Sequence, residues 1–405
     1  MKTIALYMTT ETISPALGTR VTGLKDELTE LRQWLHRIPE LGFAEKKTAY
    51  LVETILRDLG CEVTTGVGGT GVIGTLYGKK NGPSIALRAC LDALPIEEMS
   101  GVSYSSEHGG CMHACGHDGN MTMVLGAAKV LASYKGRLNG NIKFIFQPSE
   151  EDTGGAAEVI KAGGLKDPDV GFIVTPHNWH GIPLGAIVVK PGAMLASCDL
   201  FTLKITGKAG HGAWPHLAVD PIVIAAEVIT ALQRIVAREI DPMKPALVSI
   251  GTINGGTAAN IIPDAVVLEG TVRTLDAQTR DFIEKRIEEI VRGITAAAQG
   301  GYELKYQRVM PPGNNDRELC EQVRSLLRST MGDDVLTDDF EPSMGCEEFS
   351  LYQEQVPGLF MFIGNDKPGE EIIPIHSPHY VFNDEILENG VRALSEIALW
   401  YTGSK

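Results

Sequence analysis

The sequence predicts an α/β protein of two domains, in which a mostly parallel sheet is covered by helices on both faces and a smaller α+β domain is inserted. Three observations support this fold class. The 405 residues exceed what one hydrophobic core usually supports. Strand patterns alternate with helix patterns over the first half of the chain, which is typical of parallel sheets. From residue 199 onward the apolar pattern becomes that of half-buried antiparallel strands.

The first half of the chain supplies the predicted parallel sheet. Apolar runs predict strands at 72–77, 84–91, 142–147 and 170–175. Helical spacing predicts helices at 24–35, 46–59, 121–131 and 156–162. In such sheets the loops that carry functional residues follow the carboxyl ends of the strands.

The inserted domain has its own order of elements. Strands are expected at 199–207, 246–253, 265–272 and 302–309, with helices at 221–237 and 279–299. This strand-helix-strand-strand-helix-strand order predicts a compact, ferredoxin-like α+β unit. A helix at 317–330, a strand at 358–363 and a helix at 385–401 then return to the first pattern. We therefore expect a main domain at 1–195 and 310–405, with a satellite domain at 196–309.

The composition excludes some classes of partner. The 51 acidic and 36 basic residues give a formal charge of -15, which disfavours nucleic acids and anionic membranes. No run approaches the roughly 18 apolar residues that a membrane span requires. Seven scattered cysteines suit a reducing compartment better than a disulfide framework, so we expect a cytoplasmic protein.

A glycine-rich turn at 109–120 contains the first candidate metal ligands. Cys115 and His117 are separated only by Gly116, and this spacing lets a thiolate and an imidazole converge on one ion. The same turn, taken alone, fits an inert cysteine and a surface histidine. The interpretation therefore depends on ligands supplied elsewhere.

Further reactive side chains follow neighbouring strands of the predicted sheet. Asp92 follows the strand at 84–91, the pair Glu150-Glu151 follows 142–147, and His177 follows 170–175. His376 lies in a proline-flanked segment near the C-terminus. Two divalent ions about 3.5–4 Å apart need about five or six ligands and a bridging water. The residues that supply five ligands are Cys115, His117, one of the two glutamates, His177 and His376.

The two adjacent glutamates are expected to differ in role. Their side chains diverge, and two like charges in one site raise the pKa of one of them. We assign Glu151 to the metal and Glu150 as the general base, which takes a proton from the bridging water and returns it to a leaving amine. A lone glutamate pair is more often a solvated acidic loop.

Four segments resemble the M20 metallopeptidase family: Leu87–Pro95, Met112–Gly119, Gln147–Glu151 and Gly207–His216. The similarity is greatest to its amidohydrolase branch, which includes aminoacylases, hippurate hydrolases and hydrolases of auxin-amino acid conjugates. It runs from about residue 31 to residue 399. The resemblance implies a catalytic domain and a satellite domain that dimerises through its sheet edge.

The resemblance also implies roles for individual residues. The ligands of a dinuclear site are Cys115, His117, Glu151, His177 and His376, with Glu150 as the base. In relatives the histidine that matches His211 polarises the substrate carbonyl or binds its carboxylate, sometimes from the partner subunit. Asn260 and Arg273 are expected to face the cleft, where a guanidinium would hold a carboxylate. Both residues also fit structural roles, as a turn asparagine and an exposed strand arginine.

Four positions depart from the family pattern. Cys90 stands where relatives usually have aspartate, so that it either alters an orienting contact or binds metal itself. Asn120 and Asn254 replace frequent histidines, and Ala259 replaces a phenylalanine. These last three differences leave the usual acyl-amino acid specificity open.

The predicted function is a metal-dependent amidohydrolase that cleaves N-acyl amino acids or small dipeptides. We expect two divalent ions per chain, zinc or manganese, with cobalt or nickel as substitutes. The expected partners are the small-molecule substrate and a second copy of the chain. Two alternatives stay open: deamination of a small aromatic amine by the same site, and a catalytically inactive metal-binding relative.

Overall fold

The computed structural model describes residues 14–79, 82–152 and 154–403, which form two compact units. The first unit comprises the chain up to Gly192, Asn314–Phe340 and the chain from Leu351. The second comprises Ala193–Gly313 and Glu341–Ser350. Each unit has a hydrophobic core of its own. The domain boundaries at 196 and 309 remain sequence predictions.

A seven-stranded sheet organises the first unit. Its strand order is β1 (Glu62–Val67), β2 (Gly71–Leu76), β4 (Asn141–Gln147), β3 (Ser84–Cys90), β5 (Phe172–Pro183), β15 (Gly358–Asp366) and β6 (Ile187–Val188). The ladders β4/β3, β3/β5 and β5/β15 are parallel, whereas β2 and β6 run antiparallel to their neighbours. The predicted mainly parallel sheet is therefore confirmed.

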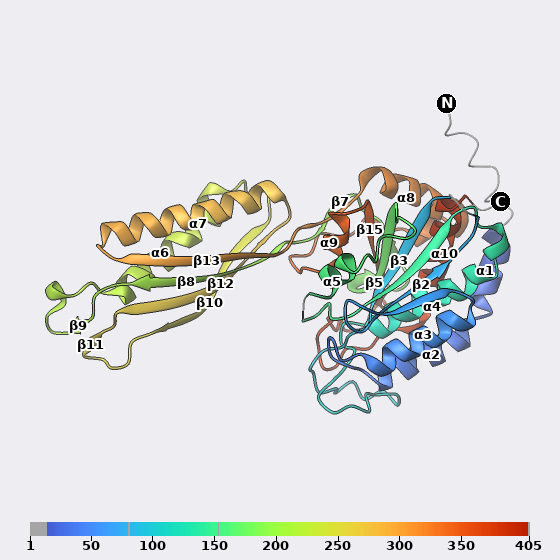
Figure 1. Cartoon of the computed structure of the whole chain (residues 1–405), viewed down its shortest axis with the longest axis horizontal. Helices are drawn as coiled ribbons and strands as arrows, with labels where there is room; N and C mark the ends of the chain where they lie inside the picture. Colours follow the sequence, from blue (N-terminus) through green and yellow to red (C-terminus); the bar gives the residue numbers. More distant parts are fainter. Residues whose placement is uncertain (1–13, 80–81, 153, 404–405) are drawn as a thin grey trace. The chain divides into compact units, whose positions relative to one another are not determined.

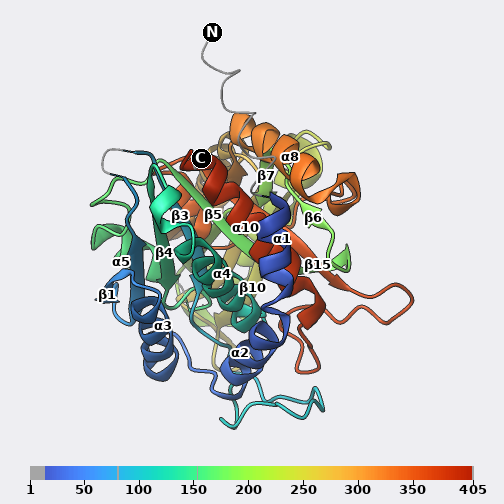
Figure 2. The ribbon, with the colours of Figure 1, turned by 90° about the vertical axis from the view of Figure 1, so that its right-hand side faces the viewer.

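Helices cover both faces of this sheet. On one face, visible in Figure 2, lie α1 (Ser14–Thr22), α2 (Lys25–Arg37), α4 (His117–Ala132) and α10 (Leu387–Tyr401). Leu87 of β3 packs into their shared core. Arg88 points to the other face, where its guanidinium lies 6.0 Å from the ring of Tyr352 in α9 (Phe349–Gln353).

The remaining helices of the first unit lie around the sheet. The edge strand β1 and its neighbour β2 pack against α3 (Lys46–Asp58), and β4 packs against α5 (Gly155–Lys161). The helix α8 (Arg317–Met331) packs against α10. Among the described residues no helix has both the length and the apolar character needed to span a bilayer.

Two predicted element boundaries near the site are wrong. The helix after the ligand turn begins at His117 rather than at residue 121. The third parallel strand does not end at residue 175 but continues to Pro183, so His177 lies within β5 rather than after it. Its pairing with β3 ends at Val174 while its pairing with β15 continues, so the missing N–H of Pro176 is tolerated. The strand β1 was not predicted.

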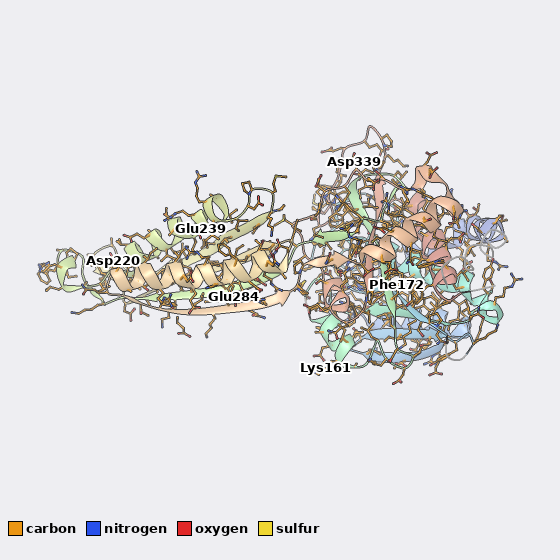
Figure 3. The ribbon with its side chains drawn as sticks, turned by 90° about the horizontal axis from the view of Figure 1, so that it is seen from above. Lys161, Phe172, Asp220, Glu239, Glu284 and Asp339 are labelled. Atoms are coloured by element: carbon orange, nitrogen blue, oxygen red, sulfur yellow. The ribbon has the colours of Figure 1, made fainter. Side chains whose placement is uncertain are left out.

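The second unit contains a four-stranded antiparallel sheet with two helices on one face (Figure 1). The strand order is β10 (Ala246–Gly255), β12 (Ala265–Thr274), β8 (Cys198–Thr206) and β13 (Gly301–Met310). The helices are α6 (Pro221–Arg234) and α7 (Ala277–Ala297). Asp220, labelled in Figure 3, precedes α6 and accepts a hydrogen bond from the Ile222 N–H at 2.9 Å. The predicted order of elements is found.

A buried ion pair ties three elements of the second unit together. Asp199 of β8 is fully buried, and Arg280 of α7 donates to both of its carboxylate oxygens at 3.0 Å. The Tyr306 hydroxyl of β13 donates to the same carboxylate at 2.8 Å. Burial and this carboxylate raise the pKa of Tyr306, so the phenol stays a donor. The carboxylate is thus compensated by a cation and by hydrogen bonds.

Candidate functional site

All five predicted metal ligands lie in the first unit, and the structure gathers them into two donor groups. One group is Cys115, His117 and His177, and the other is Cys115, Glu151 and His376. Within each group one donor atom from every residue lies within 4.8 Å of the others. Cys115 belongs to both groups.

Gly116 allows Cys115 and His117 to face the same point. Its φ of 77° is left-handed, and a Cβ there would lie 2.4 Å from the Asn178 side-chain oxygen. Any other residue would therefore be strained and would collide with β5. The turn that carries the thiol and the imidazole depends on this glycine.

A hydrogen bond fixes the orientation of His117. Its Nδ1 lies 2.9 Å from the backbone oxygen of Asp92, and because a carbonyl can only accept, Nδ1 carries the proton. Nε2 is buried, has no hydrogen-bond partner among the described residues, and is left for a cation. Burial lowers the pKa of His117, but Asp92 and Glu151 outweigh it and raise the pKa to about 9. A metal ion would therefore replace a proton on Nε2.

His177 is held as a neutral ligand. Its Nδ1 lies 2.7 Å from the Asn178 backbone oxygen, and its Nε2 lies 3.7 Å from the Cys115 sulfur. Burial and the neighbouring His117 lower the pKa of His177 to about 3. The lone pair of Nε2 therefore points toward the thiol and stays available.

Glu151 and His376 form the other side of the site. The Glu151 Oε1 lies 3.3 Å from the His376 Nε2, and the Glu151 backbone N–H donates to Asp92 Oδ2 at 2.8 Å. Burial raises the pKa of Glu151, but His376 and His117 outweigh it and lower the pKa to about 2. The carboxylate is therefore ionised at neutral pH.

The backbone of His376 is tied to the ligand turn. Its N–H donates to the Ala114 oxygen at 2.8 Å, next to Cys115 in sequence. Its φ of 67° is left-handed, a conformation rarely adopted by a residue with a side chain. The observed strain shows that the surrounding segments hold this histidine in place.

Glu150 lies beside the ligands but outside both groups that share Cys115. It is 6% exposed and forms a third group with His117 and Glu151. The preceding Ser149 has a φ of 46°, and its N–H donates to Glu45 Oε1 at 2.8 Å. A carboxylate oxygen of Glu150 and one of Glu151 lie within 4.8 Å of each other, so the two side chains do not diverge as expected from the sequence. The geometry suits a base close to one ion.

Sequence reasoning did not assign a role to Asp92 or Asn178. Asp92 is fully buried and contacts both His117 and the Glu151 backbone. Asn178 closes the space beside Gly116 and donates to the Tyr380 hydroxyl at 2.6 Å. The position of Asp92 at the end of a strand was visible in the sequence, but no sequence signal indicated the contacts of Asn178.

The other predicted site residues lie in the second unit. His211, in β9 (Gly210–His211), is exposed, and its Nδ1 accepts a hydrogen bond from the Ala213 N–H at 3.1 Å. The Asn260 backbone oxygen accepts a hydrogen bond from the Gly212 N–H at 2.8 Å, so Asn260 lies next to the residue that follows His211. Arg273 of β12 is half-buried and donates to the Val272 oxygen at 3.2 Å. Their roles toward substrate remain predictions.

The positions that depart from the family pattern have different surroundings. Asn120 is 2% exposed, and its side-chain oxygen accepts from the Asn178 N–H at 3.1 Å, so it supports β5 beside His177. Asn254 and Ala259 are exposed in the second unit. Cys90 is buried at the end of β3 beside Asp92.

The donor set fits divalent metal ions. A thiol, three imidazoles and an ionised carboxylate are the ligands that zinc prefers, and carboxylate also suits manganese. Burial and the nearby carboxylates raise the pKa of Cys115, so its thiolate form requires a compensating cation. The unpartnered Nε2 of His117 supports the same conclusion.

Comparisons with known proteins agree with this chemistry. Residues 86–400 match the profile of peptidase family M20/M25/M40. A putative amidohydrolase, YhaA of Bacillus subtilis (strain 168), is 37% identical over 97% of this chain and 99% of its own. The hippurate hydrolase of Campylobacter jejuni is 37% identical over 94% of this chain and 98% of its own. The structure of the Bacillus subtilis YxeP protein, described as a dinuclear metal binding peptidase from the M20 family, matches with a TM-score of 0.82 and 34% identity, and covers 93% of this chain and 98% of that one.

Proposed function

Because the chain belongs to peptidase family M20/M25/M40, we propose that it is a metal-dependent amidohydrolase that cleaves N-acyl amino acids or small dipeptides. The two donor groups that share Cys115, with Glu150 beside them, carry this proposal. The named activity of the similar hippurate hydrolase supports an N-acyl amino acid as the substrate class.

Each donor group would hold one divalent ion. Cys115, His117 and His177 would bind the first, and Cys115, Glu151 and His376 the second. Zinc and manganese fit these donors, and cobalt or nickel would substitute. When bound, the two metal ions lower the pKa of a coordinated water and polarise the scissile carbonyl.

Glu150 would act as the general base and then as the general acid of the reaction. Its carboxylate accepts a proton from the attacking water as the new C–O bond forms. It then donates that proton to the amide nitrogen as the C–N bond breaks, which releases a carboxylic acid and an amine. The burial of Glu150 keeps bulk water from competing for this proton. Asp92 keeps His117 in the tautomer that leaves Nε2 free.

The second unit would contribute to substrate recognition. His211 would polarise the substrate carbonyl or bind its carboxylate, with Asn260 and Arg273 as further polar contacts. The neighbouring positions of His211 and Asn260 support a joint role for these two. The His211→Ala substitution should therefore lower kcat/KM toward acyl amino acids while the metal content stays unchanged.

We also propose a cytoplasmic homodimer. No disulfide bond joins the described cysteines, which suits a reducing compartment. The edge strand β10 exposes Ile253, whereas the opposite edge strand β13 carries charged side chains, including Glu303 and Lys305. Charges on an edge strand discourage pairing, so β10 is the edge expected to meet a second copy.

The assay that tests the proposed function uses Glu150→Gln on metal-loaded enzyme with a panel of N-acyl amino acids and dipeptides. Loss of a positioned general base should lower kcat by about 10²–10⁴-fold while both ions remain bound. The exposed Glu158→Gln serves as the matched control and should keep full activity. Undiminished turnover by Glu150→Gln, or wild-type release of ammonia from aryl amines without cleavage of any acyl amino acid, would contradict the proposal.

A further inference from the structure

A second thiol, which the proposed function does not use, lies in a donor group at the same edge of the sheet. Cys90 is the last residue of β3 and is 2% exposed. The group consists of one donor atom from each of three residues, and these atoms lie within 4.8 Å of one another. The residues are Cys90, Asp92 and His117. His117 thus belongs both to this group and to the Cys115 group.

The spacing of this group is close to what one metal ion requires. Ligand bonds of about 2.0–2.3 Å at tetrahedral angles place two donors about 3.3–3.8 Å apart on a single ion, and the donors of this group lie within 4.8 Å of one another. Asp92 Oδ1 is buried and lies 3.4 Å from the His117 Nδ1. A carboxylate oxygen therefore lies beside the Cys90 thiol and the His117 imidazole.

Strand register explains why Cys90 faces this region. Cys90 pairs with Gln147 in the parallel β3/β4 ladder, so the two strands end together. Asp92 follows one strand, and Glu150 and Glu151 follow the other. A thiol at position 90 is consequently held next to the proposed ligands rather than in the distant core.

We propose that Cys90 is a further metal-binding thiol on the His117 side of the centre, which makes the site select thiophilic ions such as zinc and cobalt over manganese. The inference rests on the proposed function, since it presupposes ions at Cys115 and His117. With Cys90 and Cys115 the site has two sulfur donors. Sulfur donors favour zinc and cobalt, whereas manganese prefers oxygen donors.

Cobalt titration of the metal-free protein tests this directly, because each cobalt-thiolate bond contributes to a charge-transfer absorption band. Wild type, Cys90→Ser and Cys115→Ser are compared, with Cys111→Ser as the matched control. Cys111 is a buried cysteine of the same ligand turn that belongs to none of the donor groups. We expect a weaker band in both Cys90→Ser and Cys115→Ser and an unchanged band in Cys111→Ser.

Competition between zinc and manganese supplies a second readout. Cys90→Ser should reduce the preference for zinc over manganese by at least about 10-fold, since removal of a group that only orients a metal ligand already costs about 10–100-fold. Circular dichroism should show that the variant remains folded. If Cys90 only fills space in the core, the band and the preference stay unchanged in a folded variant, and the inference fails.

The outcomes distinguish a failure of this inference from a failure of the proposed function. An unchanged band in Cys90→Ser with a weakened band in Cys115→Ser would overturn the role of Cys90 alone. Absence of a thiolate band in wild type would overturn the proposed metal centre and the inference together.

Discussion

His36 shows how one buried side chain links pH to stability. Its Nδ1 lies 2.8 Å from Asp118 Oδ2 and its Nε2 lies 3.2 Å from Glu98 Oε1. Burial lowers the pKa of His36, but the two carboxylates outweigh it and raise the pKa to about 9. The protonated imidazole is therefore the form that the folded protein favours.

This shift predicts a pH-dependent contribution to folding. Because the folded pKa exceeds the unfolded value of about 6.5, the stabilisation is complete below that value and is lost as pH rises toward about 9. At about pH 6, His36→Gln should lower the free energy of unfolding by about 2–3 kcal/mol. Chemical denaturation at both ends of this range measures the difference. A gap between wild type and variant that does not narrow at alkaline pH would refute the prediction.

Arg280 provides a residue-scale prediction in the second unit. Removing its guanidinium by Arg280→Met leaves the Asp199 carboxylate buried without its cation. The free energy of unfolding should fall by about 3–5 kcal/mol, as for other broken buried pairs. Arg308→Gln, which removes a more exposed pair with Glu284, should cost less than about 1 kcal/mol. Equal losses in the two variants, measured by urea denaturation, would contradict the distinction.

Much of the candidate site could be predicted at this scale, because its residues follow buried strands or lie in a glycine-rich turn. Cys115, His117 and Glu151 were chosen for such positions, and the structure brings them together with His177 and His376. The supporting contacts could not be predicted. The hydrogen bond from His376 to Ala114 depends on two segments that are far apart in the sequence.

At the scale of elements, α4 is positioned by a close approach to an aromatic ring. A Cβ on Gly119 would lie 2.0 Å from the Phe382 ring. Gly119→Ala should therefore lower the free energy of unfolding by about 1–3 kcal/mol through overpacking, and it should weaken metal binding at His117. Thermal denaturation and metal titration measure the two effects.

Gly293 of α7 is the matched control for this substitution. Nothing lies within 4 Å of the Cβ that Gly293→Ala would add, and the position is exposed. Here the substitution should raise the free energy of unfolding by about 0.5–1 kcal/mol, because alanine favours the helix. Similar effects of the two substitutions would show that packing against Phe382 is not what requires a glycine in α4.

Element types were easier to predict than element ends. The order of elements in the second unit follows from the sequence, because each strand and helix has a clear apolar period. The continuation of β5 through Pro176 does not, because the pairing that tolerates the proline comes from β15, far along the chain. Placing His177 after the strand was the resulting error.

At the scale of the whole molecule, the edge strand β10 predicts the state of assembly. Ile253→Lys would place a charge on the proposed dimer edge and should convert the protein to a monomer. Glu303→Lys on the other edge strand, β13, should leave the dimer intact. Sedimentation equilibrium distinguishes these outcomes. A wild-type monomer, or a dimer that survives Ile253→Lys, would contradict the proposed interface.

Metal stoichiometry tests the central claim, that two ions share the Cys115 thiolate. Elemental analysis should find two ions per chain in wild type and one in His376→Ala, which removes a ligand from only one donor group. Cys115→Ala should weaken the binding of both ions in a metal titration of folded protein, because it removes a ligand from both groups. A Cys115→Ala variant that keeps two ions at wild-type affinity, or a wild-type chain that binds only one, would contradict the account.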